Sequence, residues 1–180
     1  MNLPNILTTF RIMLIPFYIV VFQNISFRSS VLAAAIFLVA ALTDILDGYL
    51  ARARLEVTKL GKFLDPIADK LLVVSALILL VSHQRVPAWL VIVIIGREFA
   101  VTGFRAIAAS EGVVISAENT GKYKMIFQTI SVIILTIDFK DPIFHNIGLL
   151  LLMISMILAV FSACQYFYKF GRTINLLGAK

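Results

Sequence analysis

The stretch DILDGYLARARLEVTKLGKFLDPIADK, residues 44–70, is densely charged within a chain that is otherwise apolar. It contains four aspartates, two arginines and three lysines. Long apolar runs lie on both sides of it, and a helix that crosses a bilayer takes about 20 residues of this kind. The stretch therefore predicts a charged turn between two membrane helices.

The composition of the whole chain agrees with this interpretation. Of its 180 residues 61% are hydrophobic and 14% are charged, whereas a soluble domain has about 25% charged residues. Backbone polar groups in lipid must be satisfied within the segment, so apolar runs without strand alternation predict helices. We expect an all-α integral membrane protein, one domain over residues 1–180, with six transmembrane helices. The spans are Ile6 to Gln23, Ser30 to Leu50, Leu60 to Ser82, Val86 to Ile107, Tyr123 to Ile137 and Ile143 to Phe167.

The basic residues predict the orientation of these spans. On one side the loops hold only Arg28, Arg85 and Lys140. The other side, which includes both termini, holds Arg52, Arg54, Lys59, Lys62, Arg105, Lys122, Lys124, Lys169, Arg172 and Lys180. Because basic loops stay in the cytoplasm, both termini and the charged stretch are expected to face the cytoplasm. This basic rim also explains the net charge of +6 without a nucleic-acid partner.

The sequence indicates neither a disulfide, nor a cysteine metal site, nor a signal peptide. Cys164 is the only cysteine, which excludes an intramolecular disulfide and makes a cysteine metal site implausible. The N-terminus lacks the basic region and small-residue cleavage site of a signal peptide, so we expect it to be mature.

The aspartates of the charged stretch are spaced to share helix faces. Asp44 and Asp47 are three residues apart, and Gly61, Asp65 and Asp69 repeat at intervals of four. Two antiparallel helices could bring the four carboxylates together, where they would repel unless protonated, paired or bound to metal. Oxygen ligands favour Mg²⁺, Mn²⁺ or Ca²⁺. Four carboxylates suggest two ions, which suit displacement at phosphorus.

The neighbouring residues fit a phosphorylated ligand. Gly48 and Gly61 leave room for a bulky substrate, and Arg52 can pair with a phosphate in a forked geometry. Thr58 could cap the following helix or contact the ligand. Three lysines of the stretch are interpreted as attracting anionic lipid: Lys59, Lys62 and Lys70.

These residues resemble the signature of the CDP-alcohol phosphatidyltransferases. The family pattern is Asp-x-x-Asp-Gly-x-x-Ala-Arg, a spacer, then Gly-x-x-x-Asp-x-x-x-Asp. The segments DILDGYLAR, residues 44–52, and GKFLDPIAD, residues 61–69, match every fixed position. The chain length and the six expected spans also agree with the family.

The resemblance implies a reaction and its residues. An alcohol attacks the β-phosphate of a CDP-linked lipid, forming a phosphodiester and releasing CMP. By position, Asp44, Asp47 and Asp65 would bind Mg²⁺ or Mn²⁺, with Asp69 near them as the general base. The cytidine nucleotide would be held by Gly48, Arg52, Thr58 and Gly61. The family also implies a homodimer in a membrane, here expected to be the cytoplasmic membrane of a bacterium.

Three further stretches resemble the phosphatidylglycerophosphate synthases of this family, which use CDP-diacylglycerol and sn-glycerol 3-phosphate. They are NLPNILTTFR at residues 2–11, GREFAVTGFR at 96–105 and GKYK at 121–124. The first of them points to nucleotide contacts by Asn5 and Thr8. The alternative is that Asn5, Thr8 and Arg11 are ordinary interfacial residues.

The acceptor phosphate would carry about two negative charges. Arg97 and Glu98 lie within the fourth span, where ionisable residues usually face a polar cavity. Arg105 follows two turns later, and Lys122 and Lys124 open the fifth span. We expect some of these four cations to bind the acceptor phosphate, chiefly Arg105 and Lys122, and Glu98 to pair with Arg97 or Arg105.

Several other interpretations stay open at this point. The same chemistry could use inositol phosphate or serine, and a carboxylate nucleophile could give a covalent intermediate, although direct attack is simpler. A cation-coupled transporter would also place carboxylates in a membrane, but it predicts inverted repeats and acids near the midplane. A polyprenyl transferase would lack the glycine and arginine framework.

Overall fold

The structure is a computed structural model that describes residues 3–24, 26–54, 59–110 and 119–177. Side chains are described only in part of these ranges. The backbone alone is described for residues 3–7, 44–54, 59–67, 69, 110, 119–120 and 169–177.

The described residues form six α-helices, which confirms the all-α fold class. The helices are α1 (Leu3–Gln23), α2 (Phe27–Arg54), α3 (Lys59–Ser82), α4 (Ala88–Ser110), α5 (Asn119–Ile137) and α6 (Pro142–Leu177). Each coincides with one expected span, but most run further than the apolar residues do. The helix α6 extends ten residues beyond the expected end at Phe167, because an apolar run marks lipid contact and not the end of a helix.

Within the described residues one helix is long and apolar enough by itself to cross a membrane. It is the part of α6 from Pro142 to Tyr168, 27 residues with a mean hydropathy of 2.6. Shorter apolar helical segments are Thr8–Gln23, Phe27–Thr43 and Lys70–Ser82. This pattern is consistent with a membrane protein, and six spans with cytoplasmic termini stay a prediction.

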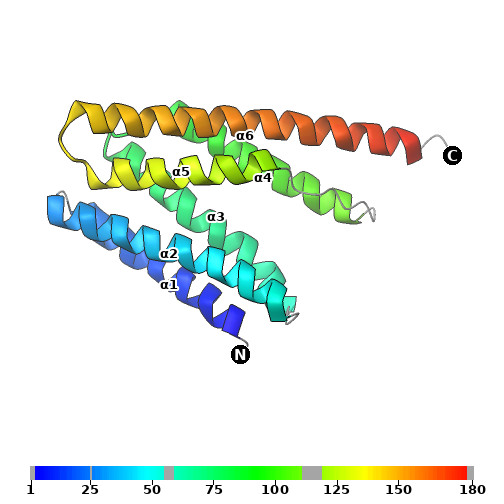
Figure 1. The fold of residues 1–180 in the computed structure, drawn as a ribbon, viewed down its shortest axis with the longest axis horizontal. Helices are drawn as coiled ribbons and strands as arrows, with labels where there is room; N and C mark the ends of the chain where they lie inside the picture. The colour runs from blue at the N-terminus through cyan, green and yellow to red at the C-terminus, as the bar shows by residue number, and fades with distance from the viewer. Residues whose placement is uncertain (1–2, 25, 55–58, 111–118, 178–180) are drawn as a thin grey trace.

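The helices form an elongated bundle whose ends differ in character. Figure 1 shows α6 lying along α5 and α4, with α1 and α2 paired on the opposite side and α3 between them. The first residues of α1, α3 and α5 and the last residues of α2, α4 and α6 lie toward the same end of the bundle. That end holds the charged stretch.

The opposite end is held together by Arg85. Its guanidinium donates to the carbonyl oxygens of Leu135 (3.0 Å) and Thr136 (2.6 Å) near the end of α5, and it pairs with Asp138 at 3.2 Å. Cations are favourable at helix C-termini. Burial lowers the pKa of Arg85. The nearby Asp138 carboxylate opposes this shift, so the ion pair offsets part of the cost of burying the guanidinium. Arg85 also lies 5.2 Å from the centre of the Phe22 ring, so it ties α1 to α5.

The polar break before α6, at residues 138–142, is a tight turn. Asp138 and Lys140 both have positive φ angles, 51° and 55°. The Asp141 carboxylate accepts a hydrogen bond from the backbone N–H of Ile143 at 2.9 Å, and Pro142 begins the helix. An acidic cap followed by proline is a common helix start.

Candidate functional site

The described positions of the charged stretch, residues 44–54 and 59–70, lie on the last turns of α2 and the first turns of α3. Four of them carry the expected metal ligands, Asp44, Asp47, Asp65 and Asp69, whose side chains lie outside the described part of the chain. The same holds for the side chains of Gly48, Arg52 and Gly61, and Thr58 lies outside the described residues altogether. The roles assigned to these residues stay predictions.

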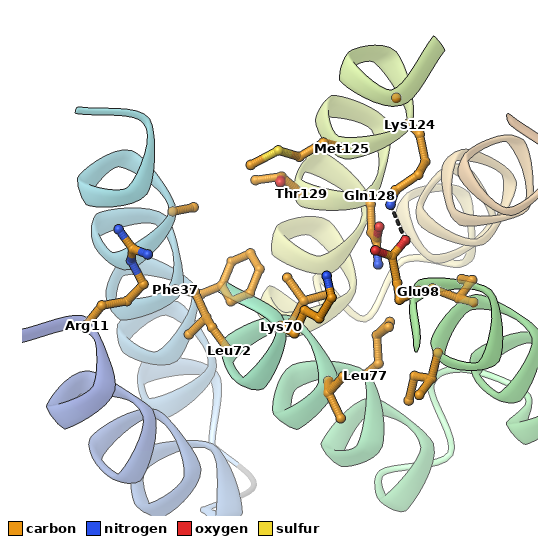
Figure 2. Close-up of a pocket in the computed structure, with 16 residues that line it drawn as sticks. Arg11, Phe37, Lys70, Leu72, Leu77, Glu98, Lys124, Met125, Gln128 and Thr129 are labelled. Atoms are coloured by element: carbon orange, nitrogen blue, oxygen red, sulfur yellow. Dashed lines mark hydrogen bonds and ion pairs between the residues drawn. The ribbon is translucent and has the colours of Figure 1, made fainter. Parts of the chain in front are cut away.

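A pocket with an empty volume of about 820 Å³ lies between the helices next to these positions. It is lined from five helices, α1 to α5 (Figure 2). Much of its wall is aliphatic or aromatic, and polar side chains come from α1, α3, α4 and α5.

The pocket lies on the helix faces that carry the aspartate positions. On α2 it is lined by Phe37 and Ala41, and positions 44 and 48 follow at the spacing of one helix face. On α3 it is lined by Val73 and Leu77, and positions 69 and 65 precede them at intervals of four. The pocket thus leads toward the end of the bundle where the aspartates stand.

Glu98 is the centre of the polar wall. Its carboxylate pairs with the Lys124 ammonium and, at 3.0 Å, with the Arg97 guanidinium. The pairing of Glu98 with Arg97 confirms one of the two partners expected from the sequence. Arg97 also donates from Nε to the carbonyl oxygen of Ala159 at 2.6 Å, which links α4 to α6. Buried charges are stable only when paired in this way.

The four expected acceptor-binding cations occupy two different environments. Lys124 is 8% exposed and lines the pocket, and Arg97 joins its ion-pair network. Arg105 and Lys122 are exposed and are not among the pocket-lining residues. The Arg105 guanidinium lies 5.5 Å from the centre of the Tyr166 ring. Of the four expected cations, Lys124 therefore lines the pocket and Arg97 is linked to it through Glu98, and the acceptor contacts stay predictions.

The α1 helix contributes Arg11, which the sequence alone left as a possible interfacial residue. Its relative exposure is 0%, and it lines the pocket. Thr8, one turn earlier, is 1% exposed. Neither is an ordinary interfacial side chain; the side chain of Asn5 is not described. The available signal was an arginine inside an apolar segment, which usually faces a polar cavity.

The ligand atoms available near the pocket bear on the expected metal ions. The described side chains contain no cluster of three or more His, Cys, Asp or Glu residues that could hold a metal. The four aspartates lie outside that set, on the two helix faces that continue the pocket. Carboxylate oxygens suit hard cations, so the residue types fit Mg²⁺ or Mn²⁺.

Comparisons with known proteins point to one family. The family model described as CDP-alcohol phosphatidyltransferase matches residues 1–163. A protein of Bacillus subtilis (strain 168) is 42% identical, and the alignment covers 93% of this chain and 94% of that protein. Proteins of Wigglesworthia glossinidia brevipalpis and Haemophilus influenzae are 38% and 37% identical, over 93% and 92% of this chain and 94% and 91% of their own length. All three are named CDP-diacylglycerol–glycerol-3-phosphate 3-phosphatidyltransferase.

Proposed function

Because the chain belongs to the CDP-alcohol phosphatidyltransferase family, we propose that it transfers the phosphatidyl group of CDP-diacylglycerol to sn-glycerol 3-phosphate. The products are phosphatidylglycerophosphate and CMP. The observation that carries the proposal is the similarity to three enzymes of that name over more than nine-tenths of the chain. It favours a transferase over the transporter that the sequence left open.

The reaction is a direct displacement at the β-phosphorus of CDP-diacylglycerol. A hydroxyl oxygen of the acceptor forms the new P–O bond, and the bond from this phosphorus to the bridging oxygen of CMP breaks. The bridging oxygen leaves with the electron pair on CMP. Asp69 takes the hydroxyl proton and later gives it to solvent. A base at this position needs to lie within hydrogen-bond reach of that hydroxyl.

Divalent cations complete the proposed site. Asp44, Asp47, Asp65 and Asp69 would hold two Mg²⁺ or Mn²⁺ ions, which when bound offset the negative charge on the phosphate oxygens. Gly48 and Gly61 leave space for the headgroup.

The nucleotide end of the lipid needs its own contacts. We assign the cytidine nucleotide to residues of α1, α2 and the α2–α3 connection. They are Asn5, Thr8, Arg52 and Thr58, together with the space above Gly48 and Gly61. The burial of Thr8 beside the pocket-lining Arg11 supports a position of α1 next to the site.

The setting of the reaction is a bacterial cytoplasmic membrane. We propose a single domain over residues 1–180 with six spans, both termini in the cytoplasm, and assembly as a homodimer. The diacyl chains would remain in the bilayer, while the water-soluble acceptor enters from the cytoplasm through the charged end of the bundle.

A comparison of acceptors tests this proposal. Purified protein in detergent is given CDP-diacylglycerol and Mg²⁺, with sn-glycerol 3-phosphate, inositol 1-phosphate or serine added separately. CMP release with glycerol 3-phosphate alone is the expected result. Release with a different acceptor would retain the transfer chemistry and overturn the assigned acceptor.

A further inference from the structure

Glu98, Lys124 and Lys70 line one side of the pocket, and Arg97 joins this charged cluster through its ion pair with Glu98. Glu98 pairs with Lys124 and Arg97, and Lys70 of α3 lines the same pocket (Figure 2). Among the described side chains of this cluster, one carboxylate therefore faces three cations. Cations in a wall that is largely apolar attract anionic groups, so the described side chains of this cluster are suited to an anionic ligand.

Gln128 lies one helical turn after Lys124 on α5 and lines the same pocket. It is 6% exposed, and its Nε2 has no hydrogen-bond partner among the residues that the structure describes. In Figure 2 its amide points into the pocket on the side of Glu98 and Lys124. A buried donor without an acceptor is unfavourable, so this amide is suited to a ligand that brings oxygen atoms.

We infer that Gln128 helps select a phosphorylated acceptor by donating a hydrogen bond from its amide to a phosphate oxygen of that acceptor. Lys124 and Lys70 supply the positive charge beside it. The inference rests on the proposed function and adds two residues, Gln128 and Lys70, to the acceptor site.

Two contacts hold Lys124 in place, one turn before Gln128 on α5. Glu98 pairs with that ammonium, and Ser155 on α6 donates a hydrogen bond to the Lys124 carbonyl oxygen at 3.1 Å. Glu98 is in this sense a positioning residue. A fixed ammonium and a neutral amide donor at adjacent turns of one helix together fit a phosphate group, which accepts several hydrogen bonds.

The position of this wall suits the proposed chemistry. Lys70 directly follows Asp69 in α3, and Val73, which lines the pocket, lies one turn after position 69. Because glycerol 3-phosphate is a short molecule, a phosphate held beside Lys70 leaves the far hydroxyl close to position 69. One ligand can then contact both the anion site and the proposed base.

The test uses the variants Gln128→Leu, which removes the amide at similar volume, and Gln128→Glu, which adds a negative charge. The matched control is Gln165→Leu. Gln165 on α6 also has a buried amide atom, Oε1, without a partner among the described residues, but it does not line this pocket.

Steady-state kinetics give the first readout. Gln128→Leu is expected to raise the KM for glycerol 3-phosphate about tenfold, since a hydrogen bond to a charged group is lost, and Gln128→Glu is expected to raise it further. The KM for CDP-diacylglycerol should stay within about twofold in both variants. Gln165→Leu should change neither value. An unchanged KM for glycerol 3-phosphate in both Gln128 variants would overturn the inference.

Ligand protection gives a second readout that needs no turnover. Inorganic phosphate and glycerol 3-phosphate should raise the unfolding temperature of the wild type and of Gln165→Leu, but much less that of Gln128→Leu. Equal protection of all three would overturn the inference. If the wild type does not use glycerol 3-phosphate, the proposed function fails, and protection by phosphate still decides whether Gln128 belongs to an anion site. Gln128→Met replaces Gln128→Leu should the latter not fold.

Discussion

Glu98 shows how single charged residues are accommodated within this apolar bundle. Its carboxylate has two cationic partners, Lys124 and Arg97, and the Arg97 side chain also bonds to a backbone oxygen of α6. Glu98 and Arg97 thus each have two polar partners, and the Lys124 ammonium has its ion pair with Glu98, which offsets the loss of hydration. Among the described side chains that line the pocket, cations outnumber the Glu98 carboxylate, which suits the proposed anionic acceptor.

Replacement of Asp69 by asparagine tests the proposed base. The amide side chain keeps the size of the carboxylate but cannot accept the proton, so Asp69→Asn should lower kcat by about 10²- to 10⁴-fold. Binding of CDP-diacylglycerol, measured by equilibrium binding in detergent, should be largely retained. Turnover at the wild-type rate would show that Asp69 is not the base.

Replacement of Arg105 tests whether this cation contacts the acceptor, as the sequence suggests, although it does not line the pocket. Loss of a cation near the acceptor path should raise the KM for glycerol 3-phosphate by about tenfold in Arg105→Ala, with a smaller rise in Arg105→Lys. Initial rates at varied acceptor concentration measure it. If only the KM for CDP-diacylglycerol changes, Arg105 belongs to the lipid headgroup site.

The helices α5 and α6 pack closely because their contact contains small and hydroxyl residues. Ser131 donates a hydrogen bond to the Gly148 carbonyl oxygen at 2.7 Å. A Cβ atom at Gly148 would lie 2.7 Å from Leu135 Cγ, and Leu135 is only 2% exposed. Small residues that allow close helix approach and hydrogen bonds between helices are typical of membrane bundles. This contact holds α5, and with it Lys124 and Gln128, against α6.

Adding a methyl group at this contact should destabilise the bundle. Gly148→Ala forces Leu135 or the helix backbone to move, at a cost of about 1–3 kcal/mol. The matched control is Gly96→Ala, since a Cβ at Gly96 meets nothing within 4 Å. Thermal unfolding in detergent should give a lower Tm for Gly148→Ala and an equal or higher Tm for Gly96→Ala. The opposite order would contradict the observed packing.

The sequence predicts the elements better than it predicts the pocket. Six apolar runs were enough to place six helices, because each run is separated by polar or turn residues. The place of the Gln128 amide in the pocket wall depends on how five helices pack, which no local pattern shows. For Arg11 the apolar segment around it indicated an inward position, but only the packing shows which pocket it lines. Glu98 lies between these cases: its charge in an apolar span indicated a partner, and only the fold selects Lys124 and Arg97.

The two ends of the bundle differ in the residues that they carry. The helix termini at the charged end include the α2 and α3 turns with the aspartates, and the opposite end contains Arg85 and the turn before α6. The proposed orientation puts the charged end in the cytoplasm, where the soluble acceptor is available. Substrate from the membrane and substrate from water can then meet at one end of the bundle.

Cysteine labelling of intact cells tests this orientation. With Cys164 replaced by alanine, a membrane-impermeant maleimide should label Arg28→Cys and Lys140→Cys, which lie at the expected outer end. Lys122→Cys should react only after the membrane is permeabilised. Labelling of Lys122→Cys in intact cells would show that the proposed orientation is wrong.

The most direct measurement is the balance of products formed by the purified protein. CDP-diacylglycerol, glycerol 3-phosphate and Mg²⁺ are supplied, and CMP and the lipid product are quantified together by mass spectrometry, with and without a chelator. The account predicts equal amounts of CMP and phosphatidylglycerophosphate, and neither product without the acceptor or without the metal. Folded protein that releases no CMP, or releases it equally fast without the acceptor, would contradict phosphatidyl transfer.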